Sequence, residues 1–157
     1  MIIMRQSDLN DQAGMERALA GYFQDEEMKH GGTLNAMLGA RLQECDYEKR
    51  TLTLCMETMP WMANPGGTLH GGVMATGFDF AMGLLCRYFS GGRMTPTIDL
   101  SINYLRPAVV SDTLIFMAEL TRRGSSICAA TGKLWAEGRE DKLLATASGS
   151  FYVLKKN

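Results

Sequence analysis

The sequence LHGGVMATGFDFAMGLLC, residues 69–86, decides how this chain folds. Gly71 and Gly72 open an apolar run that reaches Phe89, and Ser90-Gly91-Gly92 then supply a stop signal. This pattern predicts a helix from about Gly71 to Phe89. Because such a helix is apolar nearly all round, it must be buried on most of its sides, and the rest of the chain should wrap it.

One acid interrupts this apolar run. Asp79 is the only formally charged side chain between Glu57 and Arg87. A carboxylate in apolar surroundings is costly unless it is paired, hydrogen-bonded or protonated. A chain that places one there usually has a use for its raised basicity, so Asp79 is the first candidate for a catalytic residue.

The segments around the central helix alternate between apolar and polar residues, as β-strands do. Strands are predicted over residues 34–43, 50–57, 97–106, 113–122, 127–137 and 143–154. In the third of these, Ile98, Leu100, Ile102 and Tyr104 alternate and should face inward. Short connections favour antiparallel pairing, so the pattern predicts an α+β domain in which one long antiparallel sheet curls round the helix.

The N-terminal part reads differently from this domain. Residues 7–30 have loose helical spacing, with Ser7 or Asp8 as the cap, and the segment ends at Gly31-Gly32. We therefore expect a helical extension over residues 1–32 and one domain over residues 33–157. This extra helix could cap the mouth of a substrate pocket.

Composition excludes several classes of protein. At 157 residues, a net charge of −1 and a pI near 6.1, the chain has no basic footprint for nucleic acid or an anionic membrane. Its longest apolar stretch falls short of the ~20 residues of a spanning helix, and the apolar start stops at Arg5, so a soluble, unprocessed protein is expected.

The cysteines and histidines predict no metal site and no bound cofactor. The thiols have no Cys-x-x-Cys spacing and are expected to be reduced core residues in the cytoplasm; they are Cys45, Cys55, Cys86 and Cys128. His30 and His70 are the only imidazoles, and neither has a second ligand at i+3 or i+4.

The start of the central helix is a natural place for a developing oxyanion. The Gly71 and Gly72 amides have no acceptor within the helix, and the helix dipole adds partial positive charge there. Asn64 and His70 supply further donors nearby. A carbonyl polarised at this point could be attacked by water held by a carboxylate.

Helical geometry separates His70 from Asp79. Asp79 lies nine residues after His70, which is about 900° of rotation and over ~10 Å along the axis. One chain cannot easily bring both groups to the same carbonyl. If they act together, the second comes from a neighbouring subunit, which favours a two-fold dimer with composite sites.

The candidate site residues, taken in their order and spacing, form a specific combination. The series Asn64-x5-His70-Gly71-Gly72, Asp79 and Thr97-x-Asp99-Leu100-x-Ile102-x-Tyr104-x-Arg106-Pro107 resembles the hotdog-fold acyl-CoA thioesterases of the PaaI-like group, in the 4-hydroxybenzoyl-CoA thioesterase superfamily. The resemblance runs from about residue 34 to residue 154. It implies a hotdog fold and hydrolysis of a CoA thioester to a free acid and CoA.

The resemblance also implies roles for individual residues. Asp79 would be the general base or nucleophile, and the Gly71 N–H would bind the thioester oxygen with help from Asn64. His70 would orient this loop or touch the thioester, and Thr97 would hold the attacking water or Asp79. The site would lie across a homodimer, with a dimer of dimers as the expected larger assembly.

CoA is part of the substrate in this interpretation, so no cofactor is implied. Its phosphates would meet basic side chains, for which the candidates are Arg106, Arg122 and Arg123. The sequence does not define the acyl group, because aliphatic and aromatic thioesters are both handled by similar proteins.

Each residue also has a structural interpretation. Asp79 could be a buried acid bonded to backbone or a hydroxyl, and His70 could only brace its loop. Asn64 could stabilise the Pro65-Gly66-Gly67 turn, and Thr97 could simply begin a strand.

Two other functions stay open from the residues. A hotdog dehydratase or hydratase would act on the same thioesters, but the histidine-containing signatures of that class are missing. A non-catalytic acyl-CoA binding module would keep the same scaffold. An α/β-hydrolase is excluded because the chain lacks Gly-x-Ser-x-Gly.

Overall fold

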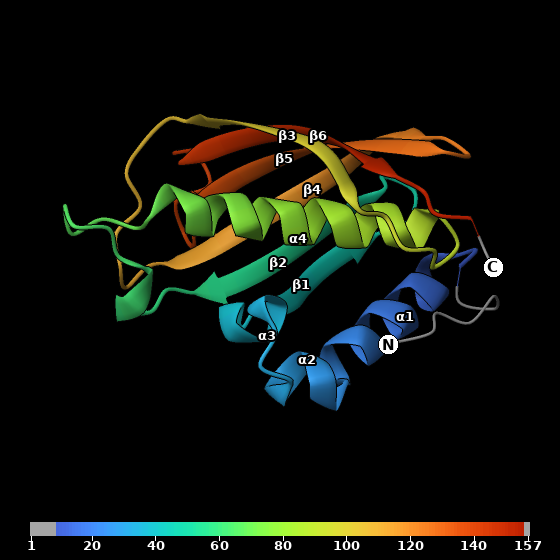
Figure 1. Ribbon diagram of the computed structural model, residues 1–157, viewed down its shortest axis with the longest axis horizontal. Helices are drawn as coiled ribbons and strands as arrows, with labels where there is room; N and C mark the ends of the chain where they lie inside the picture. Colours follow the sequence, from blue (N-terminus) through green and yellow to red (C-terminus); the bar gives the residue numbers. More distant parts are fainter. Residues whose placement is uncertain (1–8, 156–157) are drawn as a thin grey trace.

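One antiparallel sheet and one long helix make up the centre of the molecule (Figure 1). The computed structural model describes residues 9–155. The helices are α1 (Gln12–Gln24), α2 (Glu26–His30), α3 (Leu34–Leu38) and α4 (Gly71–Phe89), with a short 3₁₀ turn at Pro60–Met62. The strands are β1 (Arg41–Asp46), β2 (Thr51–Glu57), β3 (Thr97–Tyr104), β4 (Thr113–Arg123), β5 (Ile127–Ala136) and β6 (Ala145–Tyr152).

The strands form a six-stranded sheet in the order β1-β2-β4-β5-β6-β3, and every pairing is antiparallel. The register shifts once in β1, once in β3 and once in β4, and such bulges increase the local twist of a strand. The sheet curves over α4, and the helix lies along its concave side (Figure 1). The predicted α+β architecture with a central helix is therefore confirmed.

Helix α4 is buried on most sides, as its apolar sequence predicts, but it keeps one open stripe. Phe78, Met82 and Leu85 are almost fully buried. The open stripe consists of Gly72, Thr76, Asp79, Gly83 and Arg87, which are exposed or half-buried. Their spacing of three or four residues places them on a single face of the helix.

Two glycines allow α4 to lie close against the sheet. A Cβ atom on Gly77 would lie 2.3 Å from the Phe116 ring, and one on Gly132 of β5 would lie 2.7 Å from the Phe78 ring. The Phe78 and Phe116 rings meet edge to face, with centroids 5.4 Å apart. The helix therefore lies close to the sheet at Gly77 and at Gly132, because neither residue has a side chain.

The N-terminal helical segment is broken rather than continuous. The N-cap of α1 is Asp11, whose carboxylate accepts the Gly14 N–H at 2.7 Å, while the predicted caps Ser7 and Asp8 lie outside the described residues. A second cap, Asp25, accepts the Glu27 N–H at 3.0 Å and starts α2 in a new direction. The single helix predicted over residues 7–30 is thus wrong in its continuity.

The strand predicted over residues 34–43 is also wrong in its first half. Thr33 caps α3 by accepting the Ala36 N–H at 3.3 Å, and Gly39 ends it in the left-handed region at φ 60°. These local end signals override the alternation of apolar residues, since a capped turn satisfies backbone groups that a strand would leave to a partner. Strand β1 begins only at Arg41.

Strand β3 does not bury the whole alternating face that the sequence predicts. Leu100 and Ile102 pack against the core, but Ile98 and Tyr104 are 54% and 51% exposed. The reason is position: β3 is the last strand of the sheet, and within the described residues it has a neighbouring strand, β6, on one side only.

The remaining expectations concern cysteines and membrane spans. All four cysteines are free; Cys45, Cys86 and Cys128 are buried, and Cys55 is half-buried. None of the helices within residues 9–155 is long and apolar enough to cross a bilayer.

Candidate active site

The candidate catalytic acid meets a hydroxyl from the start of β3. The Thr97 Oγ1 donates to Asp79 Oδ1 at 2.5 Å. Asp79 lies on the open stripe of α4 and is half-buried, so it is not enclosed by apolar groups as its sequence neighbours suggest. Within residues 9–155 its second carboxylate oxygen receives no protein donor, and that oxygen is free to accept from water.

A cavity of about 230 Å³ opens beside this pair. We refer to it as the Asp79 cavity. One wall comes from α4, with Phe80 and Leu84 following Asp79, and another comes from residues 94–97 before β3. The third wall comes from the N-terminal helices, which contribute Tyr22 and Asn35.

The start of α4 forms a second polar centre. His70 is the N-cap, and its Nδ1 accepts the Gly72 N–H at 2.9 Å. Because Nδ1 accepts a hydrogen bond, the proton of the neutral ring is on Nε2, and the exposed ring can still donate it. The Gly71 N–H has no acceptor among the described residues, as expected of a first-turn amide.

Tyr104 holds this helix start in place, a role that the sequence did not indicate. Its hydroxyl donates to the Gly71 carbonyl at 2.9 Å. A Cβ on Gly71 would lie 3.3 Å from the Tyr104 ring, so glycine permits the ring to lie against the helix start. Tyr104 stood out only as a member of the alternating strand and of the motif that ends at Arg106-Pro107, and the alternation predicted an inward side chain instead.

Asn64 is engaged in its own loop. Its Oδ1 accepts the Gly66 and Thr68 N–H groups at 2.9 and 3.2 Å, and its Nδ2 donates to Thr68 Oγ1 at 2.8 Å. This is the turn-stabilising arrangement that the sequence allowed as an alternative. The loop in turn fixes His70, whose N–H donates to the Met62 carbonyl at 2.8 Å.

The two polar centres lie apart on one chain. Helix α4 is regular from Gly71 to Phe89, so the nine residues from His70 to Asp79 span about 13 Å along the axis. Each centre is tied to a different end of β3, one through Thr97 and the other through Tyr104. The single chain therefore presents two separate polar centres.

The three candidate arginines also separate into two groups. Arg106 lies just beyond Tyr104, and its Nη1 donates to the Leu143 carbonyl at 2.7 Å. Arg122 and Arg123 are the last two residues of β4. Arg123 pairs with Cys128, whereas Tyr104 aligns through β6 and β5 with Phe116, so these two arginines lie at the opposite end of the strands from Arg106. Seven residues of β4 separate these levels, about 23 Å.

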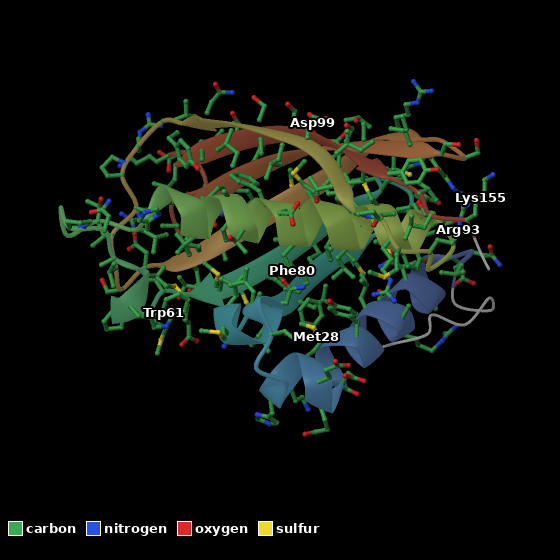
Figure 2. The ribbon with its side chains drawn as sticks, viewed as in Figure 1. Met28, Trp61, Phe80, Arg93, Asp99 and Lys155 are labelled. Atoms are coloured by element: carbon green, nitrogen blue, oxygen red, sulfur yellow. The ribbon has the colours of Figure 1, made fainter. Side chains whose placement is uncertain are left out.

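Arg123 lines a second hollow, of about 480 Å³, together with Arg93 and Ser125. Figure 2 places Arg93 at the C-terminal end of α4. The described residues include no cluster of three His, Cys, Asp or Glu side chains suited to a metal ion.

An antiparallel sheet wrapped round one long helix defines a hotdog-type fold, and here that helix carries an acid, Asp79, and a free amide, that of Gly71, at its start. The model of the thioesterase superfamily matches residues 66–142. A curated relative from Escherichia coli K12, medium/long-chain acyl-CoA thioesterase YigI, is 30% identical over 138 residues, which cover 76% of this chain and 84% of that protein. The chain belongs to the thioesterase superfamily.

Two further similarities agree with this family. Human acyl-coenzyme A thioesterase 13 is 35% identical over 91 residues; the match covers 52% of this chain and only 64% of the length of that relative. The crystal structure of a phenylacetic acid degradation-related protein from Ralstonia eutropha superposes with a TM-score of 0.73 at 27% identity, covering 88% of this chain and 98% of that one.

Proposed function

We propose that this protein hydrolyses acyl-CoA thioesters. Water and the thioester give a free acid and the thiol of CoA, with Asp79 as general base or nucleophile and the Gly71 N–H as oxyanion donor. The observation that carries the proposal is the Thr97–Asp79 hydrogen bond at one end of β3, with the free Gly71 amide at the other. The names of YigI and acyl-coenzyme A thioesterase 13 support this substrate class.

The active enzyme in this proposal is a homodimer formed through β3. Strand β3 is an edge of the sheet, and its outer edge has no partner among the described residues. Edge strands offer unpaired N–H and C=O groups to a second chain. Exposed Ile98 at one end of β3 and Leu105 just beyond the other supply apolar surface for such contact.

The same pairing would complete the active site. Two copies of β3 related by a two-fold axis run antiparallel, so the Thr97 end of one lies beside the Tyr104 end of the other. Asp79 lies beside the Thr97 end of the strand and Gly71 lies beside the Tyr104 end, because the residues of each pair are hydrogen-bonded to each other. Asp79 of one copy would thus face Gly71 and His70 of a second copy. Pairs of dimers would then build the expected larger assembly.

Within this site, Thr97 holds the Asp79 carboxylate so that its free oxygen faces the substrate. His70 fixes the loop against the helix start, because its Nδ1 accepts the Gly72 N–H, and it offers its Nε2 proton to the thioester. Asn64 supports the carbonyl indirectly, because its own amide closes the turn that carries His70.

The phosphates of CoA would be met at one end of the sheet. Arg106 belongs to the Tyr104 end, whereas Arg122 and Arg123 belong to the other, so the three arginines form two alternative phosphate sites. Arg106→Gln and Arg123→Gln distinguish the two sites. The relevant variant raises KM for an acyl-CoA but leaves KM for the matching acyl-pantetheine unchanged, since only the former carries the phosphates.

The decisive experiment measures release of free thiol from a panel of acyl-CoA substrates by the purified protein, with its own four cysteines subtracted as a blank. Asp79→Asn should lose most of the activity and keep the circular dichroism spectrum of the wild type. A normal rate in Asp79→Asn rejects the mechanism. Saturable binding without turnover supports a binding module, and conversion of an enoyl thioester without thiol release supports a hydratase.

A single turnover in H₂¹⁸O separates the two roles of Asp79. If Asp79 attacks the thioester, water can open the resulting anhydride at the Asp79 carbonyl, and ¹⁸O then appears in the peptide that contains Asp79. If Asp79 activates water, all of the ¹⁸O enters the product acid.

A further inference from the structure

The Asp79 cavity runs along α4, from the catalytic acid toward the C-terminal end of the helix. Its lining includes Asp79 at one end and Arg87 at the other. Eight residues of α-helix span about 12 Å. Between these ends the lining is mixed: Phe80 and Leu84 from α4 and Pro96 are apolar, whereas Thr95 and Asn35 are polar.

The far wall of this cavity comes from the N-terminal helices. Tyr22 of α1 lies against Phe80, with ring centroids 6.1 Å apart, and Phe23 lies 6.0 Å from the same ring. Figure 2 shows Phe80 on the side of α4 that faces the N-terminal helices. The Tyr22 side chain is 8% exposed, so its ring is held in place rather than free to swing aside.

A polar contact fixes the Tyr22 hydroxyl. Burial raises the pKa of Tyr22, and a side-chain hydrogen bond with Asn35 of α3 works against that rise. The phenol is therefore neutral at physiological pH, and its ring and Asn35 form one joined wall. This wall comes from residues outside the stretch that the superfamily model matches, residues 66–142.

We infer that Tyr22, supported by Asn35, closes the acyl cavity and sets the length of the acyl chain that this enzyme accepts. The inference rests on the proposed thioesterase function. An extended acyl chain advances about 1.25 Å per carbon–carbon bond, so ~12 Å holds about 8 to 10 carbons. The volume of about 230 Å³ agrees with a slender chain, because pockets for drug-sized ligands measure roughly 300–1,000 Å³.

Acyl-CoA substrates from 2 to 18 carbons test this inference. The wild type should have its highest kcat/KM at about 8 to 10 carbons. Tyr22→Ala should raise the ratio of kcat/KM for the 14-carbon substrate to that for the 8-carbon substrate about tenfold, since removing the ring opens the wall that the N-terminal helices contribute and gives a longer chain room to pass. Tyr22→Trp should shift the preference toward shorter chains, and Tyr22→Phe, which keeps the ring, should match the wild type.

Tyr47→Ala is the matched control. Tyr47 packs on α4 as well, with ring centroids 6.4 Å from Tyr88 and 5.5 Å from Phe89, but it lies outside the Asp79 cavity. The control should leave the 14-to-8-carbon ratio within about twofold of the wild type. Tyr22→Leu replaces Tyr22→Ala if the larger truncation prevents folding.

The outcomes distinguish the two proposals. If the wild type releases no thiol from any acyl-CoA, the proposed function fails. If the wild type is active but the chain-length profile of folded Tyr22→Ala or Tyr22→Leu matches the wild type, only the inference about Tyr22 is overturned. An equal shift in Tyr47→Ala overturns it as well, because the effect would then come from general loosening of α4.

Discussion

A single hydroxyl group determines how the candidate acid is presented. Thr97 donates to one oxygen of Asp79 at 2.5 Å, which leaves the other oxygen directed away from β3. A hydrogen bond to a charged group is typically stronger than one between neutral groups. The orientation of the carboxylate therefore depends on a residue eighteen positions further along the chain.

Thr97→Val removes this donor while keeping the shape of the side chain. We expect kcat for the best acyl-CoA to fall about tenfold, because the carboxylate loses a hydrogen bond worth about 1.5 kcal/mol. Steady-state kinetics measure the change, and KM should stay within about twofold. Thr97→Ser keeps the hydroxyl and should retain most of the activity; equal losses in both variants would contradict a role for the hydrogen bond.

A second single residue, Cys45, makes the free energy of unfolding depend on pH. Burial, with a smaller effect of Glu16, raises the pKa of this thiol from 9.0 to about 11. Above pH 9 the unfolded chain loses the proton while the folded chain keeps it, so the free energy of unfolding decreases as pH rises from about 9 to about 11.

Chemical denaturation of the wild type and of Cys45→Ala at pH 8 and pH 11 isolates this contribution. The wild type should lose about 2 kcal/mol more stability than Cys45→Ala over this range. Parallel losses in the two proteins would mean that Cys45 has the same pKa in the folded and unfolded chain.

At the scale of elements, the close packing of α4 on the sheet depends on glycines at the contact, Gly77 in the helix and Gly132 in β5. Gly77 lies directly over the Phe116 ring, which is 2% exposed, and a Cβ at this position would lie 2.3 Å from the ring. The distance of the ring explains why the helix accepts a residue of low helix propensity.

Gly77→Ala should lower the free energy of unfolding by about 1–3 kcal/mol, because the added methyl overlaps the ring. Gly21→Ala is the matched control, since Gly21 is an exposed helical glycine of α1 whose Cβ would meet nothing within 4 Å. The control should gain about 0.5–1 kcal/mol. Urea unfolding curves measure both, and a stabilised Gly77→Ala would refute the close approach.

Element boundaries show where sequence reasoning succeeds and fails. Helix α4 is predicted to the residue, because its apolar run and its end signals agree. Strand β1 is predicted too early, because the Thr33 cap and the Gly39 end signal form a helix where apolar alternation suggests a strand. Local hydrogen bonds decide whether such short segments form a helix or a strand, and the pattern of apolar residues carries no information about these bonds.

At the scale of the whole molecule, the proposed assembly depends on the outer edge of β3, which has no partner strand within residues 9–155. The polar centres at Asp79 and at Gly71 are bonded to opposite ends of this strand, and the composite site of the proposal needs a second copy of the chain. Ile98 supplies a variant that tests this assembly, because it is 54% exposed at the start of β3.

Ile98→Lys should convert the dimer to a monomer, since a charge on an edge strand opposes pairing with another edge. Sedimentation measures the assembly, and acyl-CoA hydrolysis should be lost together with the dimer. Ile127→Lys is the matched control, because Ile127 is 43% exposed on the β4–β5 hairpin. A monomer that keeps full activity would rule out a site shared between subunits.

The sequence by itself determined the central helix, the antiparallel sheet and the candidate residues Asp79, Gly71 and Thr97. The helix, the sheet, Asp79 and Gly71 follow from periodicity, from end signals and from one charge in an apolar run, which are local properties, whereas Thr97 was implied by the resemblance to the PaaI-like thioesterases. Only the tertiary structure decided that Tyr104 holds the helix start, that Tyr22 faces the cavity of Asp79, and that the arginines separate into two groups. Each of these depends on contacts between residues far apart in the chain, and the direction in which a side chain points is set by its neighbours in space.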